Sequence, residues 1–315
     1  MSAIPTAWLF PGQGSQFVGM GRDLFASYPP ARELLAVASD LVGVNLAQII
    51  ARGPDALLTR TDNLQPALMV VNLGCCMLLQ ESGVPMHAVA GHSLGEFSAL
   101  YAAGVLDPHD TLRLVVERGR LMHEVASTLD GGMLAVKDLD IGILEPIIAD
   151  IARTHAVGIA NCNTPVQTAI SGDRAGLARA AEALAARGGR IVPLNVSGPW
   201  HSPLLQSASE RFVEVLRGVR FHDARVPVVL NVSGTALTAA GEIRALMEQQ
   251  LCNPVRWMQV QRTLYGLGVR RFVEVGPGNV LRGLMRGLAE LTACEVVNFD
   301  GPKSLRFLWP AGSLT

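Results

Sequence analysis

Short apolar runs that end in glycine or proline alternate along this chain with longer segments of helical periodicity. Ala7–Phe10 ends at Pro11-Gly12, and Ala88–Ala90 leads directly into Gly91. Such runs are typical of buried strands that end in tight loops. Further strands are expected over 228–232 and 271–275, and helical spacing of apolar residues covers 30–50, 66–79 and 111–126. This alternation predicts an α/β architecture with a parallel sheet.

The pattern changes near Asp130-Gly131-Gly132. Strands are expected over 133–136, 157–161, 167–171 and 190–196, with helices over 143–154 and 174–187. This β-α-β-β-α-β order is the ferredoxin-like pattern. We therefore predict a small inserted domain over 128–197 and a large domain in two parts, 1–127 and 198–301. Residues 302–315, which contain Pro302, Pro310 and Gly312, are expected to form a loose tail.

The composition of the chain argues against several classes of protein. The chain has 315 residues, 49% of them hydrophobic and 17% charged, and a net charge of −1. It can bury a large core, and it has no overall positive charge to hold nucleic acid. The stretch 64–79 is interrupted and short for a membrane span, and no basic residue precedes the first apolar run. The five cysteines show no CxxC spacing, so we expect neither disulfides nor a metal site, and a cytoplasmic location.

The clearest chemical signal is Gly91-His92-Ser93-Leu94-Gly95, which matches G-x-S-x-G between an expected strand and an expected helix. Glycines at these positions permit the strained turn that exposes a serine hydroxyl. The following helix directs its N-terminus at the site, which favours developing negative charge. We therefore predict that Ser93 is a nucleophile.

A serine nucleophile needs a base, and His201 has the most suggestive position of the seven histidines. It follows Gly198-Pro199-Trp200, where the inserted domain returns to the large one, so we expect it to line the cleft between them. No Asp or Glu stands out as a third member of a triad. A second glycine-rich loop, Phe10–Gln16, lacks the lysine of a P-loop. It is better suited to bind an oxyanion or substrate through Gln13.

Eight motifs in order resemble the malonyl-CoA:acyl-carrier-protein transacylases of fatty acid and polyketide synthesis. The resemblance covers about residues 7–290. Its motifs are FPGQGSQ, QPA at 65–67, GHSLGEFSAL, ERGRLM around Arg118, NCNTPVQTAISG from Asn161, VSGPWHSPLL, QQLCNPVRW from Gln249 and VEVGPGNVL from Val273.

The resemblance implies an α/β-hydrolase-like large domain with an inserted ferredoxin-like domain. It implies ping-pong transfer of a malonyl group from malonyl-CoA through an ester on Ser93 to the phosphopantetheine thiol of an acyl carrier protein. His201 is then the general base, oriented by the backbone carbonyl of Gln250. The backbone N–H groups of Gln13 and Leu94 form the implied oxyanion hole.

Arg118 matches the position at which this family clamps the free carboxylate of malonate. A guanidinium fork suits that role because it binds a carboxylate through two parallel hydrogen bonds. Gln65 and Asn163 match other positions near the substrate. Trp200 departs from the Phe or Ser that the family often has beside the base, and we expect the larger ring to reshape the acyl pocket.

Other functions share parts of this pattern. A discrete acyl hydrolase of a polyketide system would keep Ser93 and His201 but usually lack the arginine clamp. A malonyl-loading subunit of malonate decarboxylase would use the same chemistry. A non-catalytic module that docks carrier proteins belongs to a different class, and the combination of Ser93, His201, Gln13 and Arg118 argues against it.

The expected partners are malonyl-CoA and an acidic carrier protein, with neither nucleic acid nor membrane. No bound cofactor is expected, and the coenzyme A thioester is a substrate. Because the chain is nearly neutral, attraction of an acidic carrier requires a local patch. The candidates are Arg187, Arg190, Arg282 and Arg286.

Overall fold

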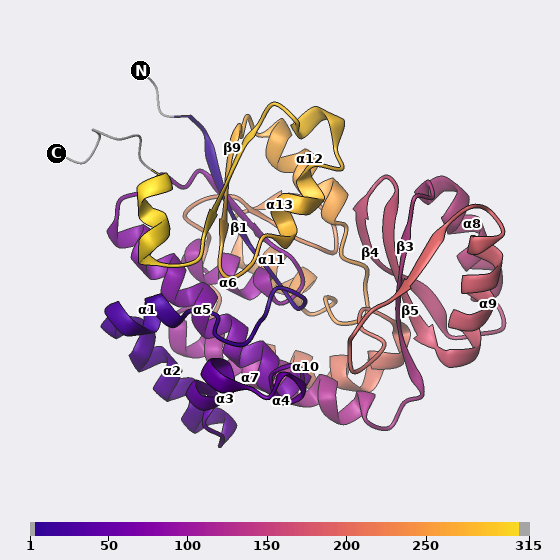
Figure 1. Cartoon of the computed structure of the whole chain (residues 1–315), viewed down its shortest axis with the longest axis horizontal. Coiled ribbons are helices and arrows are strands. Elements are labelled where there is room, and N and C mark those ends of the chain that lie inside the picture. Colours follow the sequence, from indigo (N-terminus) through magenta and orange to yellow (C-terminus); the bar gives the residue numbers. More distant parts are fainter. Residues whose placement is uncertain (1–3, 309–315) are drawn as a thin grey trace.

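The computed structural model of this protein describes residues 4–308. Its larger sheet has six strands in the order β10-β9-β1-β2-β7-β8, and neighbours pair in parallel except the antiparallel pair β7–β8. Because β1 and β2 lie side by side near the centre, the loops that follow them meet at one edge of the sheet (Figure 1). The strands are Thr6–Phe10 (β1), Ala88–Gly91 (β2), Val228–Val229 (β7), Ala236–Leu237 (β8), Arg271–Val275 (β9) and Glu295–Phe299 (β10).

Helices cover both faces of this sheet. Successive side chains of a strand point to opposite faces. On β1, Trp8 and Phe10 pack into the larger core, whereas Ala7 and Leu9 pack into a second core. The larger core is completed by Arg22–Ser27 (α1), Pro29–Val42 (α2), Leu46–Arg52 (α3), Asp55–Leu58 (α4), Thr61–Glu81 (α5), Gly95–Ala102 (α6), Pro108–Ala126 (α7), Gln206–Arg217 (α10) and Ala240–Met247 (α11). The second core is completed by Trp257–Gly266 (α12) and Val280–Met285 (α13).

Helix α5 lies at the centre of the larger core. It is 21 residues long and, by length and composition alone, is sufficiently apolar to cross a membrane. The protein buries 83% of its most apolar window, however, which is the behaviour of a core helix. Most of its surface packs against α2, α6 and α7, and this packing fixes α7, the helix that carries Arg118.

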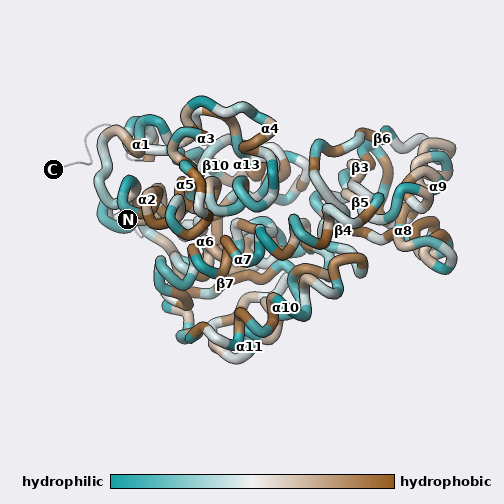
Figure 2. The backbone as a smooth tube through the Cα atoms, turned by 90° about the horizontal axis from the view of Figure 1, so that it is seen from below, coloured by the Kyte–Doolittle hydropathy of each residue, from teal (hydrophilic) through white to brown (hydrophobic). Residues whose placement is uncertain are grey.

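The smaller sheet lies at one end of the molecule, beside the larger one (Figures 1 and 2). Its strands are Gly131–Lys137 (β3), Val157–Thr164 (β4), Gln167–Asp173 (β5) and Arg190–Pro193 (β6), in the antiparallel order β4-β5-β3-β6. Helices Ile141–Ile151 (α8) and Arg174–Ala185 (α9) cover one face and enclose a core of their own. Asn161 on β4 forms a bridge to Val255, which ties this sheet to the large domain.

The predicted combination of a parallel α/β sheet and an inserted β-α-β-β-α-β sheet is confirmed. All four strands of the small sheet lie between the predicted boundaries at 128 and 197. The expected strand over 190–196 ends earlier, at Pro193, because Leu194 and Val196 turn toward a cavity between the domains. The expected strand over 228–232 is likewise only two residues long, and the chain then turns at Asn231.

Two features of the C-terminal region differ from expectation. Strand β10 lengthens the main sheet beyond β9 and has no counterpart among the predicted elements. Residues Pro302–Phe307 form a short 3-10 helix rather than a loose tail, and the following Leu308 is buried in the main core. The remainder of the predicted tail, 309–315, lies outside the described residues.

Candidate active site

Ser93 stands on a tight turn between β2 and α6. Its backbone has a φ of 51°, a left-handed conformation that L-residues seldom adopt. The turn is compact because a Cβ on Gly91 would lie 2.0 Å from the carbonyl of Gly95. A Cβ on Gly95 would in turn lie 2.1 Å from the carbonyl oxygen of Phe10. Both glycines are therefore required for the turn that presents the Ser93 hydroxyl.

His201 lies against that hydroxyl, with 2.7 Å between its Nε2 and Ser93 Oγ. It also has a left-handed backbone, with a φ of 55°. Its Nδ1 lies 3.1 Å from the carbonyl oxygen of Gln250 and 3.1 Å from that of Asn253. Carbonyl oxygens only accept, so Nδ1 carries the proton and Nε2 is free to accept from Ser93. The expected carbonyl of Gln250 is present, and Asn253 provides a second carbonyl that sequence reasoning missed.

The pKa of His201 is lowered to about 3, first by burial and then by the positive charge of Arg118. A lowered pKa means that the unfolded chain binds the proton more readily than the fold, so acid favours unfolding. His201 therefore makes the fold less stable as the pH falls below about 6.5, the ordinary pKa of histidine, and has no such effect at neutral pH.

We predict that wild type loses more stability on acidification than His201→Gln does. The difference between the two proteins should change by up to about 2 kcal/mol between pH 6.5 and pH 5, at roughly 1.36 kcal/mol per pH unit. Urea unfolding of both proteins at several pH values measures it. Burial raises the pKa of Glu96 to about 7, and its titration has the opposite sign. Both proteins contain Glu96, so its contribution cancels in the difference between them. If their unfolding free energies depended on pH in the same way, His201 would not be neutral and buried.

Arg118 extends from α7 into the same site and is 1% exposed. Its Nη2 donates to Ser93 Oγ over 3.2 Å, its Nη1 to Gln65 Oε1 over 2.8 Å and its Nε to Gln250 Oε1 over 3.1 Å. A guanidinium has five N–H donors, so two remain for another acceptor. Burial lowers the pKa of Arg118 to about 10, which leaves the group charged at neutral pH.

A buried carboxylate, Glu96, supports this cluster from the second residue of α6. Its Oε1 accepts the backbone N–H of Asn231 over 2.7 Å, and its Oε2 accepts from Gln250 Nε2 over 2.6 Å. Asn231 Oδ1 in turn accepts the N–H of Ser93 over 2.7 Å. Sequence reasoning missed Glu96 and Asn231. A signal was present for Glu96, because it is the only charged residue in the apolar helix α6.

The Ser93 hydroxyl opens into a small cavity of about 80 Å³ between the two domains. Gln13 and Leu94 line it, as expected for oxyanion donors. Within residues 4–308, the backbone N–H of neither residue donates to a protein acceptor. The rest of the lining is His92, Ser93, Arg118, Met122, Met133, Asn161, Leu194, Val196, Trp200 and His201. The cavity therefore combines a nucleophile, a base and a cation with apolar walls.

Three residues predicted near the substrate have different positions. Trp200 lines the cavity and is 4% exposed, and its Nε1 has no acceptor among the described residues. Gln65 is not part of the lining and instead holds Arg118. Asn163 also lies behind the lining, where its Oδ1 is 3.0 Å from His92 Nε2. Gln65 and Asn163 therefore support side chains of the cavity wall.

The first pair of candidate docking arginines lies on the small domain. Arg187 follows α9, and Arg190 begins β6, where its Nε donates to Asp138 Oδ2 over 2.9 Å. Strand β6 is the edge of the small sheet opposite to β4.

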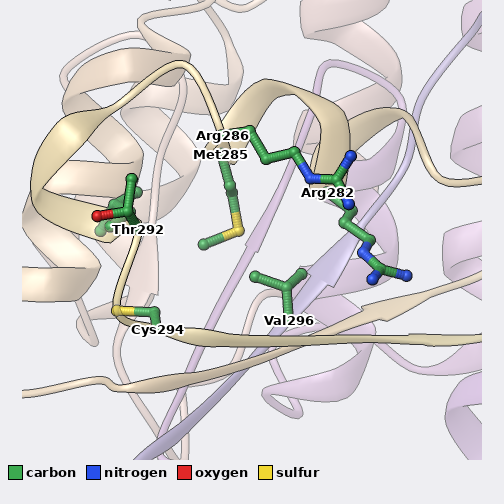
Figure 3. Close-up of a pocket in the computed structure, with 7 residues that line it drawn as sticks. Arg282, Met285, Arg286, Thr292, Cys294 and Val296 are labelled. Carbon is green, nitrogen blue, oxygen red and sulfur yellow. The ribbon is translucent and has the colours of Figure 1, made fainter.

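The second pair lies on the large domain, at α13. Arg282 and Arg286 flank a surface cavity of about 220 Å³, together with Met285, Thr292, Cys294 and Val296 (Figure 3). Gly287, just beyond them, packs against Thr164 of β4. The two pairs are therefore near opposite edges of the small sheet and do not form one continuous cluster.

Comparison with known proteins places this site in context. The family model described as "Acyl transferase domain" matches residues 7–299. The chain is 40% identical over 282 residues to the malonyl CoA-acyl carrier protein transacylase of Bacillus subtilis (strain 168), covering 89% of each chain. It is 38% identical over 294 residues to the enzyme of that name from Escherichia coli (strain K12), covering 93% of this chain and 95% of that one.

Solved structures of malonyl-transferring enzymes have the same fold as this chain. The malonyl-transacylase PlMCAT, in complex with the type II PKS acyl-carrier protein AntF, superposes with a TM-score of 0.91 at 36% identity, covering 96% of this chain and 98% of that one. An acyl carrier protein S-malonyltransferase from Vibrio cholerae superposes with a TM-score of 0.91 at 34% identity, covering 96% and 99%.

Proposed function

This chain belongs to the acyl transferase family of malonyl CoA-acyl carrier protein transacylases, and from that premise we propose a mechanism in which Ser93 carries the malonyl group between malonyl-CoA and an acyl carrier protein. The observation that supports it most directly is the convergence of two groups, a base and a cation, on the hydroxyl oxygen of Ser93. Ser93 Oγ lies 2.7 Å from the base His201 and 3.2 Å from a buried guanidinium nitrogen of Arg118.

In the first half-reaction, Ser93 Oγ attacks the thioester carbonyl of malonyl-CoA while its proton passes to His201 Nε2. The carbonyl oxygen becomes negative and accepts the backbone N–H groups of Gln13 and Leu94, each worth about 2.7–4 kcal/mol of barrier in comparable enzymes. The C–S bond then breaks, coenzyme A leaves as a thiol with the proton from His201, and a malonyl ester remains on Ser93.

The second half-reaction reverses these roles with a different thiol. The phosphopantetheine thiol of the carrier protein gives its proton to His201 and attacks the ester carbonyl. The C–O bond breaks, and Ser93 Oγ regains its proton from His201. Two carbonyl acceptors keep a proton on Nδ1 through both half-reactions, so Nε2 is the nitrogen that takes up and returns the transferred proton.

The proposal is tested by intact-protein mass measurement. After incubation with malonyl-CoA, we expect one added malonyl group on the enzyme. Subsequent addition of holo carrier protein should remove that mass and place it on the carrier. A malonyl group that is lost to water as quickly with or without carrier would instead favour the acyl hydrolase alternative.

Arg118 selects the acyl group in this proposal, because its two remaining N–H donors suit the free carboxylate of malonate. We predict that Arg118→Ala lowers kcat/KM for malonyl-CoA by roughly two to three orders of magnitude. Removal of one partner of a buried charge pair costs about 3–5 kcal/mol. Each tenfold loss in kcat/KM corresponds to about 1.4 kcal/mol. Acetyl-CoA has no carboxylate to lose, so its use should be spared or improved.

The measurement for Arg118→Ala is the rate of Ser93 acylation by malonyl-CoA and acetyl-CoA side by side. Arg120, two residues further on α7, pairs with Glu117 and Glu124 at the surface, so Arg120→Ala is the matched control. If Arg118→Ala loses both substrates equally, the arginine supports the fold rather than malonyl recognition.

The carrier protein is proposed to dock through arginines of the candidate pairs. Reversal of charge at Arg187 and Arg190 should raise KM for carrier protein about tenfold at low ionic strength and leave KM for malonyl-CoA unchanged. The same reversal at Arg282 and Arg286 tests the other edge, and Arg217→Glu on α10 controls for the change in net charge. A pair whose reversal changes neither constant is not part of the docking surface.

Several predictions from sequence stay predictions. They are the cytoplasmic location, the absence of a bound cofactor and the role of Trp200 as a wall of the acyl pocket. The same chemistry serves fatty acid and polyketide pathways, and a malonyl-loading subunit of malonate decarboxylase would share it.

A further inference from the structure

The side-chain amide of Gln250 lies between a buried anion and a buried cation. On one side, its Nε2 donates to Glu96 Oε2 over 2.6 Å; on the other, its Oε1 accepts from Arg118 Nε over 3.1 Å. The same Nε2 also donates to the carbonyl oxygen of Ser93 over 3.0 Å. All three side chains are about 1% exposed, so water does not shield these contacts.

The direction of the hydrogen bonds allows only one orientation of this amide. If it were flipped, its NH₂ would face the N–H of Arg118, and its oxygen would face the carboxylate of Glu96. Glu96 must also accept at both oxygens, because the N–H of Asn231 points at Oε1. These two hydrogen bonds favour the ionised carboxylate and offset part of the burial that raises the pKa of Glu96 to about 7.

The charges explain why an amide separates the two ions. All three hydrogen-bond partners of Arg118 are neutral, and Glu96 is the carboxylate that acts on its charge. A direct ion pair would occupy the guanidinium fork. With the amide between them, Glu96 compensates the buried charge while two N–H donors remain available for a carboxylate from outside.

We propose that Glu96, acting through the side-chain amide of Gln250, is the positioning residue that holds Arg118 ready for the free carboxylate of the acyl group. This inference rests on the proposed malonyl transfer. It assigns Gln250 two separate functions: its backbone carbonyl orients His201, and its side chain fixes Arg118. Neither Glu96 nor the amide touches the reacting atoms.

Glu96→Gln should disturb Arg118 at a distance. The new side chain has one oxygen and one NH₂, so it cannot accept from both Asn231 and Gln250. If it accepts from Asn231, its NH₂ opposes that of Gln250. The amide of Gln250 must then either turn its NH₂ toward Arg118 or lose its contact. Malonyl transfer should suffer, whereas acetyl transfer, which does not use the guanidinium fork, should suffer less.

Gln250→Met provides an independent test. Methionine has a similar length and keeps the backbone carbonyl that accepts from His201, but it bonds neither Glu96 nor Arg118. It should therefore lower malonyl selectivity while the base remains oriented. This variant keeps the proposal testable even if Glu96→Gln does not fold.

Glu274→Gln is the matched control. Glu274 is also fully buried in the main sheet, where it accepts from the N–H groups of Leu281 and Arg282 and from Asn298 Nδ2, each over 2.9 Å. Loss of its charge should lower stability without any change in selectivity, because none of these three partners lines the acyl cavity.

The experiment measures Ser93 acylation by malonyl-CoA and acetyl-CoA in wild type, in Glu96→Gln, Gln250→Met, Arg118→Ala and Glu274→Gln, and in the double variant Glu96→Gln/Arg118→Ala. We expect the malonyl-to-acetyl ratio of kcat/KM to fall at least tenfold in Glu96→Gln and in Gln250→Met. In the Arg118→Ala background, Glu96→Gln should lower the ratio no further, since the two residues act through one contact chain.

Equal losses with both substrates, or a ratio that falls further in the double variant, would overturn the inference. Failure of the proposed function has a different signature. In that case wild type itself forms no malonyl ester or shows no malonyl preference that Arg118→Ala removes. A preference that depends on Arg118 but not on Glu96 or Gln250 would refute only the positioning role.

Discussion

Ser93→Ala should form no acyl-enzyme with malonyl-CoA and transfer nothing to a carrier protein. The change removes the one oxygen on which the base and the guanidinium converge. In other enzymes with a serine–histidine pair, loss of the nucleophile costs about six orders of magnitude in kcat. Intact-protein mass after incubation with malonyl-CoA measures the result directly.

The fold should survive this substitution. Serine and alanine have the same Cβ, so the φ of 51° strains both alike, and the backbone N–H of residue 93 still bonds Asn231. Ser98→Ala is the control, because Ser98 is a buried hydroxyl of α6, the helix after Ser93, and it accepts from Asn72 Nδ2 instead of contacting a reacting group. An ester that still forms on Ser93→Ala would place the nucleophile elsewhere.

His201→Ala should slow acylation of Ser93 by about 10²–10⁴-fold, the usual contribution of a general base. Its ring nitrogen is the only side-chain acceptor that the described residues place within hydrogen-bond distance of Ser93 Oγ. Single-turnover acylation by malonyl-CoA separates this effect from the later transfer step. Rapid mixing with a mass or fluorescence readout gives the rate.

His92→Ala is the comparison variant, since His92 is the other histidine of the cavity lining. Its Nε2 faces Asn163 and its ring packs edge-on against Trp257, so it should cost much less than His201→Ala. The reverse order of effects would transfer the role of base to His92.

Much of the site was predictable because its motifs encode local geometry. The turn around Ser93 requires glycines on either side, and a strand and a helix that meet there are visible in the hydrophobic pattern. His201 was found from its place at the return of the inserted domain. The fold class followed from the order of elements, which changes character at Gly131.

Contacts between distant segments were not predictable in the same way. Asn231 bonds Ser93 across 138 residues, and the amide of Gln250 reaches Glu96 across 154. Nothing in either local sequence indicates the partner, because the sheet and the return of the inserted domain bring them together. The positions of surface arginines are harder still to predict from sequence, because no packing constraint fixes where an exposed charge must lie.

The central position of β1 has a consequence for the chain during its synthesis. Its two neighbours are β2 and β9, and β9 leaves the ribosome roughly 260 residues after β1. At about 5–20 residues per second, one edge of this apolar strand lacks its partner for ten seconds or more. A chain cut short before Val275 would keep that edge open, and an open apolar edge promotes aggregation. We therefore expect nascent chains to need protection of this edge until β9 has been made.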